Sequence, residues 1–164
     1  DLHKEYRRQR QMCIRDRYSC AYFLSPDESL EDAQQNKINH IIKKLDLRAG
    51  QKVLDIGCGW GGMAFEIAKK SQCEVTGISL SQNQINYCNK KAKELKLDNQ
   101  VHFKLCDYRE VKEQFQRIVS VGAFEHFGKK FYKIFFKKVH NLMTDDGICL
   151  LHTCLLYTSP SPRD

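Results

Sequence analysis

The sequence lacks several features that would assign it to a class at once. Its 164 residues hold no run of 18 apolar residues, so no segment is expected to span a membrane. No stretch near residue 1 joins basic residues to a long apolar segment, which predicts that a secretory signal is absent. Eight cysteines are present but none forms a C-x-x-C pair, so a metal site is not expected and reduced thiols are favoured over disulfides. These absences favour a cytoplasmic protein.

The two ends differ in composition from the middle of the chain. Residues 1–17 are polar and basic, and residues 154–164 are rich in Ser and Pro. Both resemble translated sequencing-adapter strings, so we expect them to be non-native and residues 18–153 to carry the fold. The alternative is a basic membrane-binding arm at the front and a Ser/Pro linker at the back. Residues 18–153 carry 20 Lys and Arg against 16 Asp and Glu, which is too mild an excess to predict nucleic-acid binding.

Short apolar segments alternate with helical patterns through the middle. The patterns predict helices over 31–45, 63–70, 82–95 and 129–142, a short helical piece near residue 110, and strands over 53–56, 74–79, 101–106, 118–121 and 148–152, the last after a turn at 145–147. Such alternation predicts an α/β fold with about five parallel strands and helices on both faces of the sheet. Ligands of these Rossmann-like sheets bind beyond the carboxyl ends of the strands.

The glycine-rich loop at residues 55–62 (DIGCGWGG) follows a predicted strand and opens a helix. Its glycines also match G-x-G-x-x-G, so the loop alone fits either a dinucleotide or S-adenosylmethionine. A dinucleotide site needs an acid at the end of the second strand, but that strand ends in Gly-Ile-Ser-Leu-Ser. Asp55 is suited to face the cationic amino group of a methionine moiety, with loop capping as its alternative role. The loop therefore favours S-adenosylmethionine and a class I methyltransferase sheet.

Two residues after the third predicted strand suit an adenine ring. Asp107 supplies a carboxylate and Tyr108 a flat ring at the sheet edge where ligands bind. For Asp107 alone, a solvated turn residue is the alternative.

Five segments then occur in a familiar order: 18–23 (YSCAYF), 53–62 (VLDIGCGWGG), 79–84 (SLSQNQ), 120–128 (SVGAFEHFG) and 150–153 (LLHT). Together they make residues 18–153 resemble the cyclopropane-fatty-acyl-phospholipid synthases and mycolic acid cyclopropane synthases. The resemblance implies methyl transfer from S-adenosylmethionine to a cis double bond of an unsaturated phospholipid acyl chain. A bound bicarbonate then takes a proton from the new methyl group, and a cyclopropane ring closes. The family's last two strands have no counterpart, so the resemblance implies an incomplete methyltransferase domain.

The resemblance also implies the residues of the site. Glu125 would orient the bicarbonate through a shared proton, His152 would donate a hydrogen bond, and Cys20 would offer a backbone or thiol contact. The implied cofactor residues are Tyr18, Ser19, Asp55, Gly57, Cys58, Gly59, Trp60, Gly61, Ser79, Gln84, Tyr108 and Arg109. Each of these three residues also has a structural alternative: Cys20 a buried thiol, Glu125 part of a capping pair with His126, and His152 a histidine of the core.

A lipid enzyme has to visit a membrane, and the resemblance implies peripheral contact with the inner membrane surface. A cationic face is predicted on the 129–142 helix by Lys129, Lys133 and Lys137, with Lys130 and Lys138 beside them. The buried side is predicted to consist of Phe131, Ile134, Phe135 and Leu142. An ordinary solvated lysine face is the alternative.

A sheet that ends after its fifth strand leaves an apolar edge, which predicts poor solubility or a homodimer through that edge. Two other functions remain open. One is a small-molecule amine methyltransferase on the same scaffold, which would not need Cys20, Glu125 and His152. The other is a truncated, non-catalytic S-adenosylmethionine-binding fragment.

Overall fold

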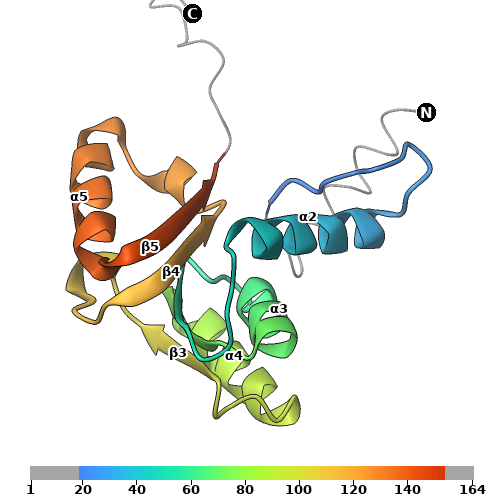
Figure 1. Cartoon of the computed structure of the whole chain (residues 1–164), viewed down its shortest axis with the longest axis horizontal. Coiled ribbons are helices and arrows are strands. Elements are labelled where there is room, and N and C mark those ends of the chain that lie inside the picture. The colour runs from blue at the N-terminus through green and yellow to red at the C-terminus, as the bar shows by residue number, and fades with distance from the viewer. Residues whose placement is uncertain (1–18, 154–164) are drawn as a thin grey trace, which may run out of the picture.

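Five parallel strands form one sheet in the computed structural model, which describes residues 19–153 (Figure 1). The strands are β1 (Lys52–Ile56), β2 (Glu74–Ser79), β3 (Val101–Leu105), β4 (Phe115–Val121) and β5 (Met143–His152). Their order across the sheet is β3-β2-β1-β4-β5, and every neighbouring pair is parallel. The chain moves outward from β1 to β3 and then crosses back to the other side of β1. The carboxyl ends of β1 and β4 therefore flank the topological switch point, where ligands of such sheets bind.

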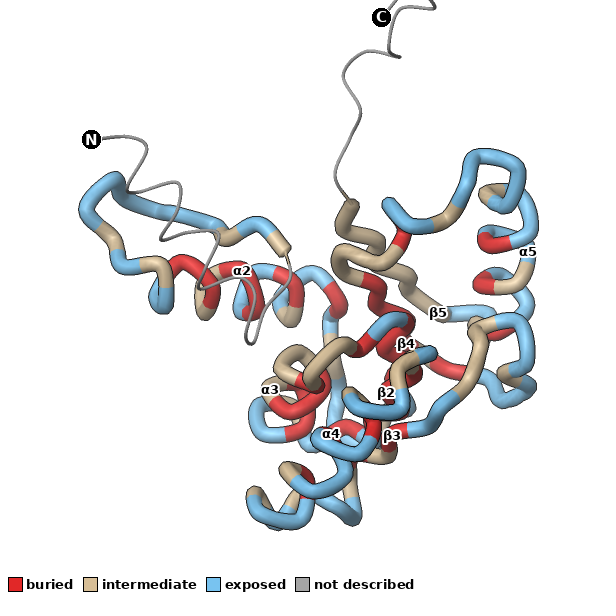
Figure 2. Tube along the Cα trace, turned by 180° about the vertical axis from the view of Figure 1, so that it is seen from behind, coloured by how far each residue is buried: buried red, intermediate tan, exposed pale blue. Residues whose placement is uncertain are grey.

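Helices cover both faces of the sheet. The α-helices are α2 (Leu30–Lys44), α3 (Gly62–Ser71), α4 (Gln82–Glu94) and α5 (Tyr132–Leu142), and the 3₁₀ turns are η1 (Tyr108–Glu110), η2 (Phe124–His126) and η3 (Lys129–Phe131). Alternate residues of a strand point to opposite faces, so Val53 packs with α2, α3 and α4, while Leu54 packs with α5. Figure 2 shows the buried residues along the strands and on the inner sides of the helices. The predicted α/β fold with helices on both faces is confirmed.

A serine caps the first helix. Ser29 is the N-cap of α2, and its Oγ accepts a hydrogen bond from the Asp32 backbone N–H at 3.1 Å. Ile38, Ile41 and Leu45 follow at helical spacing and are buried. None of the helices within residues 19–153 is long and apolar enough to cross a lipid bilayer.

A buried arginine fastens the end of α2 to the sheet. Arg117 of β4 is 3% exposed and donates to the carbonyl oxygens of Leu45, Asp46 (3.0 Å), Gln116 (2.8 Å) and Asp146 (3.3 Å). Its guanidinium thus satisfies carbonyl groups just beyond the helix, which lack partners within it.

The structure corrects the sequence analysis in the region of α5 and β5. The predicted helix over 129–142 is a 3₁₀ turn followed by α5, and this break shifts the helical period. As a result Phe131 and Ile134, which were predicted on the buried side, are 37% and 49% exposed. The predicted turn at 145–147 lies inside β5 as an irregularity, because Phe115 pairs with Met143 whereas Arg117 pairs with Ile148.

Candidate cofactor and active site

A cleft of about 280 Å³ opens at the carboxyl ends of β1, β2 and β4. Its walls come from the glycine loop, the start of α4, the loop after β4, and one side of α2. Eight of the predicted cofactor residues line it: Ser19, Asp55, Gly57, Cys58, Gly59, Trp60, Ser79 and Gln84. The structure therefore places most of the predicted cofactor residues around one cavity at the switch point.

The glycine loop is held in place by close packing. Gly57 has a φ of +78°, and a β-carbon there would lie 2.6 Å from the β-carbon of Ala123. Gly61 has a φ of +81°, and its missing β-carbon would lie 2.8 Å from the Phe65 ring. Gly61 is the N-cap of α3 and makes no side-chain capping bond, so the first N–H groups of this helix have no such partner. Gly61 thus packs beneath the loop, and a helix N-terminus of this kind suits a polar or anionic ligand group.

Asp55 is the most unusual ionisable group in the cleft. Its side chain is 2% exposed, and its Oδ2 atom has no hydrogen-bond partner within residues 19–153. Burial in this low-dielectric position raises the pKa of the Asp55 carboxyl to about 7. A loop-capping role is not seen at Oδ2. A cationic ligand group would supply the missing partner and favour the charged carboxylate.

A neutral polar pair stands where a dinucleotide site would have an acid. Ser79, the last residue of β2, donates from Oγ to the Gln84 Oε1 atom at 2.7 Å. The Ser81 backbone N–H donates to Ser79 Oγ at 3.1 Å, which fixes the hydroxyl at the start of α4. Serine and glutamine side chains both donate and accept hydrogen bonds, so the pair is suited to ribose hydroxyls.

A second cavity of about 220 Å³ adjoins the first and shares Gly57, Ser79, Ala123 and His126 with it. Its remaining lining residues are mostly apolar: Ile56, Ile78, Leu80, Cys106, Asp107, Tyr108 and Phe127. Leu80 is 74% exposed, which is high for a large apolar side chain. A flat heterocycle placed in this cavity would cover it.

Tyr108 and Asp107 lie in this second cavity, but Arg109 does not. Tyr108 stacks on Phe127 with ring centroids 5.3 Å apart. Arg109 is exposed and donates hydrogen bonds to both carboxylate oxygens of Asp107, at 2.8 Å and 2.6 Å. These hydrogen bonds lower the pKa of the Asp107 carboxyl. Arg109 therefore acts on the cavity through Asp107.

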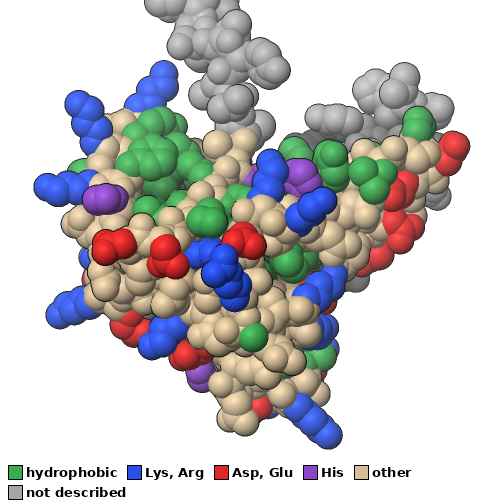
Figure 3. Space-filling view, viewed as in Figure 1, with side chains coloured by type: hydrophobic (Ala, Val, Ile, Leu, Met, Phe, Trp, Pro, Cys, Tyr) green, Lys and Arg blue, Asp and Glu red, His purple; other side chains and the backbone are tan. Residues whose placement is uncertain are grey.

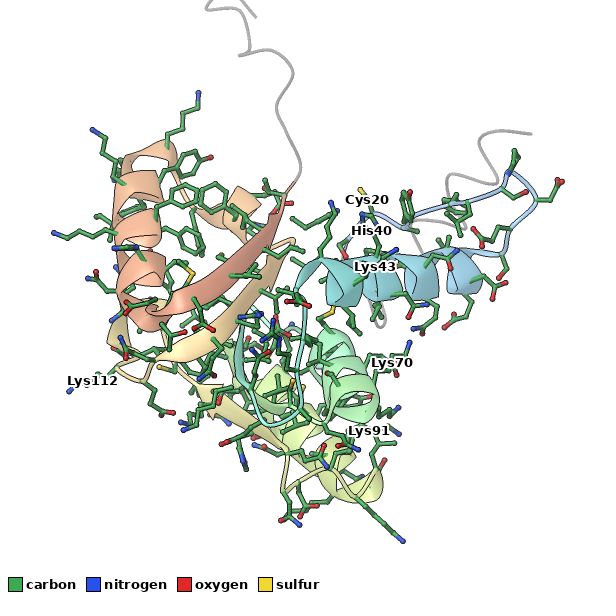
Figure 4. The ribbon with its side chains drawn as sticks, viewed as in Figure 1. Cys20, His40, Lys43, Lys70, Lys91 and Lys112 are labelled. Carbon is green, nitrogen blue, oxygen red and sulfur yellow. The ribbon has the colours of Figure 1, made fainter. Side chains whose placement is uncertain are left out.

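The three predicted catalytic residues do not line the first cleft, but each is next to or bonded to a residue that does. Cys20 follows the lining residue Ser19 and is exposed; Figure 4 shows it beyond α2, on the side away from α3. Glu125 is exposed and precedes His126, a lining residue. His152 accepts a hydrogen bond at its backbone oxygen from the N–H of Gly122, which also lines the cleft.

No contact between Cys20, Glu125 and His152 is present among the hydrogen bonds described for residues 19–153, so their joint role stays a prediction. The Nδ1 atom of His152 is buried and has no hydrogen-bond partner in the described part of the chain. His152 therefore reaches the cleft only through the contact of its backbone oxygen with Gly122. Tyr18 lies outside the described residues.

Sequence reasoning missed two lining residues that bear on the chemistry. Lys37 of α2 lines the first cleft, and His126 lines both cavities. A signal for Lys37 was present, because it stands between Ala33 and Ile41 at the spacing of the buried stripe of the helix. His126 gave no such signal, since its position depends on how the loop after β4 folds back.

The strand order, the glycine loop at the switch point and the buried carboxylate below that loop define a class I S-adenosylmethionine-dependent methyltransferase fold. A family model described as mycolic acid cyclopropane synthetase matches residues 11–162, and the chain belongs to this family.

Three known proteins illustrate the relationship. The chain is 45% identical over 136 residues to the cyclopropane-fatty-acyl-phospholipid synthase of Escherichia coli strain K12, covering 83% of this chain and 34% of that protein. The crystal structure of mycolic acid cyclopropane synthase CmaA1 complexed with SAH and CTAB matches with a TM-score of 0.78 and 40% identity, over 82% of this chain and 47% of that one. Coclaurine N-methyltransferase bound to N-methylheliamine and SAH matches with a TM-score of 0.77 and 30% identity, over 83% and 40%. The chain thus spans between a third and a half of the length of these proteins.

Proposed function

We propose that the protein to which this chain belongs transfers a methyl group from S-adenosylmethionine to a cis double bond of an unsaturated phospholipid acyl chain and closes it to a cyclopropane ring. The observation that carries the proposal is the buried Asp55 carboxylate beneath the glycine loop in a chain of this family. A cation is the partner that such a carboxylate needs. S-adenosylmethionine carries one in its amino group and supplies an electrophilic methyl group when bound.

The residues of the two cavities divide the binding of this molecule between them. Asp55 holds the ammonium group, and Ser79 with Gln84 receives the ribose hydroxyls. Tyr108 and Leu80 enclose the adenine in the second cavity. Each group thereby fixes the position of the methyl carbon relative to the cleft, and positioning of this kind supplies much of the rate enhancement of transfer reactions.

Ring closure needs a base next to the acyl chain. The double bond donates its electron pair to the methyl carbon, the sulfur leaves with the old bonding pair, and a proton of the new methyl group passes to the base as the ring forms. We propose that Cys20, Glu125 and His152 would hold a bicarbonate ion, which would supply this base when bound. The buried Nδ1 atom of His152 has no hydrogen-bond partner within residues 19–153, and a polar group left in this way supports a role in holding a ligand.

The test uses the native full-length protein, vesicles of cis-unsaturated phospholipid and S-adenosylmethionine with a fully deuterated methyl group. Ring formation leaves two of the three deuterium atoms in the acyl chain, because one leaves as the proton that the base removes. Capture of the intermediate carbocation by water would instead give a hydroxylated chain that keeps all three. Mass spectrometry of the released acyl chains that finds no modified product would contradict the proposal.

A second candidate is an amine methyltransferase, favoured by the similarity to coclaurine N-methyltransferase. Methyl transfer to an amine nitrogen needs no base for a methyl proton. Replacement of Glu125 by Gln would then leave methyl transfer nearly unchanged, whereas ring formation would fall by roughly 10²-fold or more, as for loss of a general base.

We also propose that the surface around η3 and α5 contacts anionic membranes. Phe131, Ile134 and Phe136 are exposed there. The exposed cations beside them are Lys129, Lys130, Lys133 and Lys137. Figure 3 shows an apolar area over α5 with Lys or Arg side chains at its rim. Lys138 is not part of this face, because its Nζ donates to the Val111 carbonyl at 2.6 Å. Apolar side chains among lysines suit an interface of lipid headgroups and acyl chains.

A further inference from the structure

A buried lysine on α2 forms part of the cofactor cleft. Lys37 is 6% exposed and lines the cleft, although lysine is rarely this buried. It occupies a position on the inner side of α2, between the buried Ala33 and Ile41. Placing an ammonium group there costs free energy that an apolar side chain would not. The position therefore points to a use for the charge.

Lys37 is hydrogen-bonded to Ser19, another residue that lines the cleft. Its Nζ donates to Ser19 Oγ at 2.5 Å and to Gln34 Oε1 at 2.6 Å. Gln34 is also buried, and its Nε2 donates to the Ser19 carbonyl at 3.1 Å. Ser19 is therefore held through both its side chain and its backbone, and it also lines the cleft. The ammonium and the Ser19 hydroxyl lie together at one wall.

A carboxyl group from the sheet lines the same cleft. Asp55 lies two residues after Val53, so its side chain points to the face of the sheet that α2 covers. Its Oδ2 atom is buried without a hydrogen-bond partner within the described residues, and Asp55 lines the same cleft as Lys37. One cavity thus holds a buried ammonium group from α2 and a buried carboxyl group from β1, and a cationic ligand group would favour the charged form of that carboxyl. A ligand that carries both charges on one carbon atom matches this arrangement.

We propose that Lys37, together with Ser19, binds the carboxylate of the methionine moiety of S-adenosylmethionine, while Asp55 binds its ammonium group. The inference rests on the proposed function as far as the identity of the cofactor is concerned. Charge-assisted hydrogen bonds of this kind are about twice as strong as neutral ones. Lys37 is therefore a residue that selects an intact amino-acid zwitterion over an adenosine derivative that lacks the carboxylate.

The test compares two ligands that differ only in that carboxylate. Isothermal titration with S-adenosylmethionine and with decarboxylated S-adenosylmethionine measures the dissociation constants for the native full-length protein and for Lys37→Met. We expect the native protein to prefer the intact ligand by about 10- to 100-fold, the range for one charged hydrogen-bonded contact. In Lys37→Met this preference should disappear because the affinity for the intact ligand falls, while the affinity for the decarboxylated ligand changes by less than about threefold.

Two control variants separate this role from a structural one. Lys43→Met removes an exposed lysine from the same helix and should leave both affinities unchanged (Figure 4). Asp55→Asn should weaken both ligands to a similar extent, because both carry the ammonium group. Equal weakening of both ligands in Lys37→Met would show that Lys37 only supports the fold, and would overturn the inference.

The comparison of ligands on the native protein needs no variant, so it decides the matter even if Lys37→Met fails to fold. If the native protein binds both ligands equally, the carboxylate has no partner in the cleft and the inference is wrong, while the proposed function stands. If the native protein binds neither ligand, the proposed function fails as well.

Discussion

Gly57 and Ala123 bring the loops after β1 and β4 into direct contact: a β-carbon on Gly57 would lie 2.6 Å from that of Ala123. These two strands flank the switch point of the sheet, and both loops line the cleft. The contact therefore sets the width of the cleft at its base.

Replacement of Gly57 by Ala should disrupt the cleft. The φ of +78° is unfavourable for alanine, and the new methyl group would collide with Ala123. We expect a loss of about 1–3 kcal/mol in the free energy of unfolding, the usual range for backbone strain, together with loss of S-adenosylmethionine binding. For the free energy of unfolding, Gly62→Ala in the same loop is the matched control, because nothing lies within 4 Å of its missing β-carbon. Equal effects of the two substitutions in urea titrations would contradict this explanation.

The protonation of Asp55 should make stability fall as pH rises from about 4 to about 7. The folded-state pKa is raised from 3.8 to about 7, so in this window the folded state keeps a proton that the unfolded state has lost. Asp55→Asn should remove this part of the pH dependence. The measurement is the difference in unfolding free energy between the native protein and the variant across that range. A difference that does not change with pH would show that the carboxyl is not perturbed.

Arg117 should be necessary for the docking of α2. Arg117→Met leaves buried carbonyl groups of Leu45 and Asp46 without their donor, which should cost about 3 kcal/mol in the free energy of unfolding. Because α2 carries Lys37, the affinity for S-adenosylmethionine should fall too. Arg48→Met is the control, since the Arg48 side chain is 75% exposed and its loss should change stability by less than about 0.5 kcal/mol. If Arg117→Met leaves the affinity for S-adenosylmethionine unchanged, the docking of α2 does not contribute to cofactor binding.

Membrane contact through α5 should depend on both kinds of side chain. The double substitution Lys133→Glu and Lys137→Glu should weaken binding to vesicles that contain anionic phospholipid, measured by co-sedimentation. The binding free energy should fall by about 1 kcal/mol for each lysine removed. Ile134→Ser should also weaken binding. Lys43→Glu and Lys44→Glu on α2 make the same change in net charge at another exposed site. If both pairs weaken binding equally, the overall charge and not the α5 surface determines the contact.

The sequence was sufficient for the order of elements and for the glycine loop, because these signals are local. The segment predicted as the second strand coincides with β2, and the loop from Asp55 follows β1 directly. Asp55 could be predicted as a site residue because it stands next to that loop. Its missing partner and raised pKa could not, since they depend on the packing of α2 and α3 over the sheet.

Residues are predicted wrongly or missed where their environment depends on how one element packs against another. Lys37 faces the cleft only because α2 docks beside the glycine loop. The sequence predicts Phe131 on the buried side because one helical period fits residues 129–142, whereas the structure has a 3₁₀ turn, η3, before α5. The catalytic role of Cys20, Glu125 and His152, and self-association through the β5 edge, remain predictions.

The most direct test of the account is a titration of the native protein and Asp55→Asn with S-adenosylmethionine and with NAD. At the cleft, β2 ends with Ser79 where a dinucleotide site would have an acid, and the Asp55 carboxyl group is buried beneath the glycine loop. We predict that the native protein binds S-adenosylmethionine and not NAD, and that Asp55→Asn weakens this binding by roughly 10-fold or more, as expected for loss of a charged hydrogen bond. Binding of NAD, or an affinity for S-adenosylmethionine that is unchanged in Asp55→Asn, would contradict it.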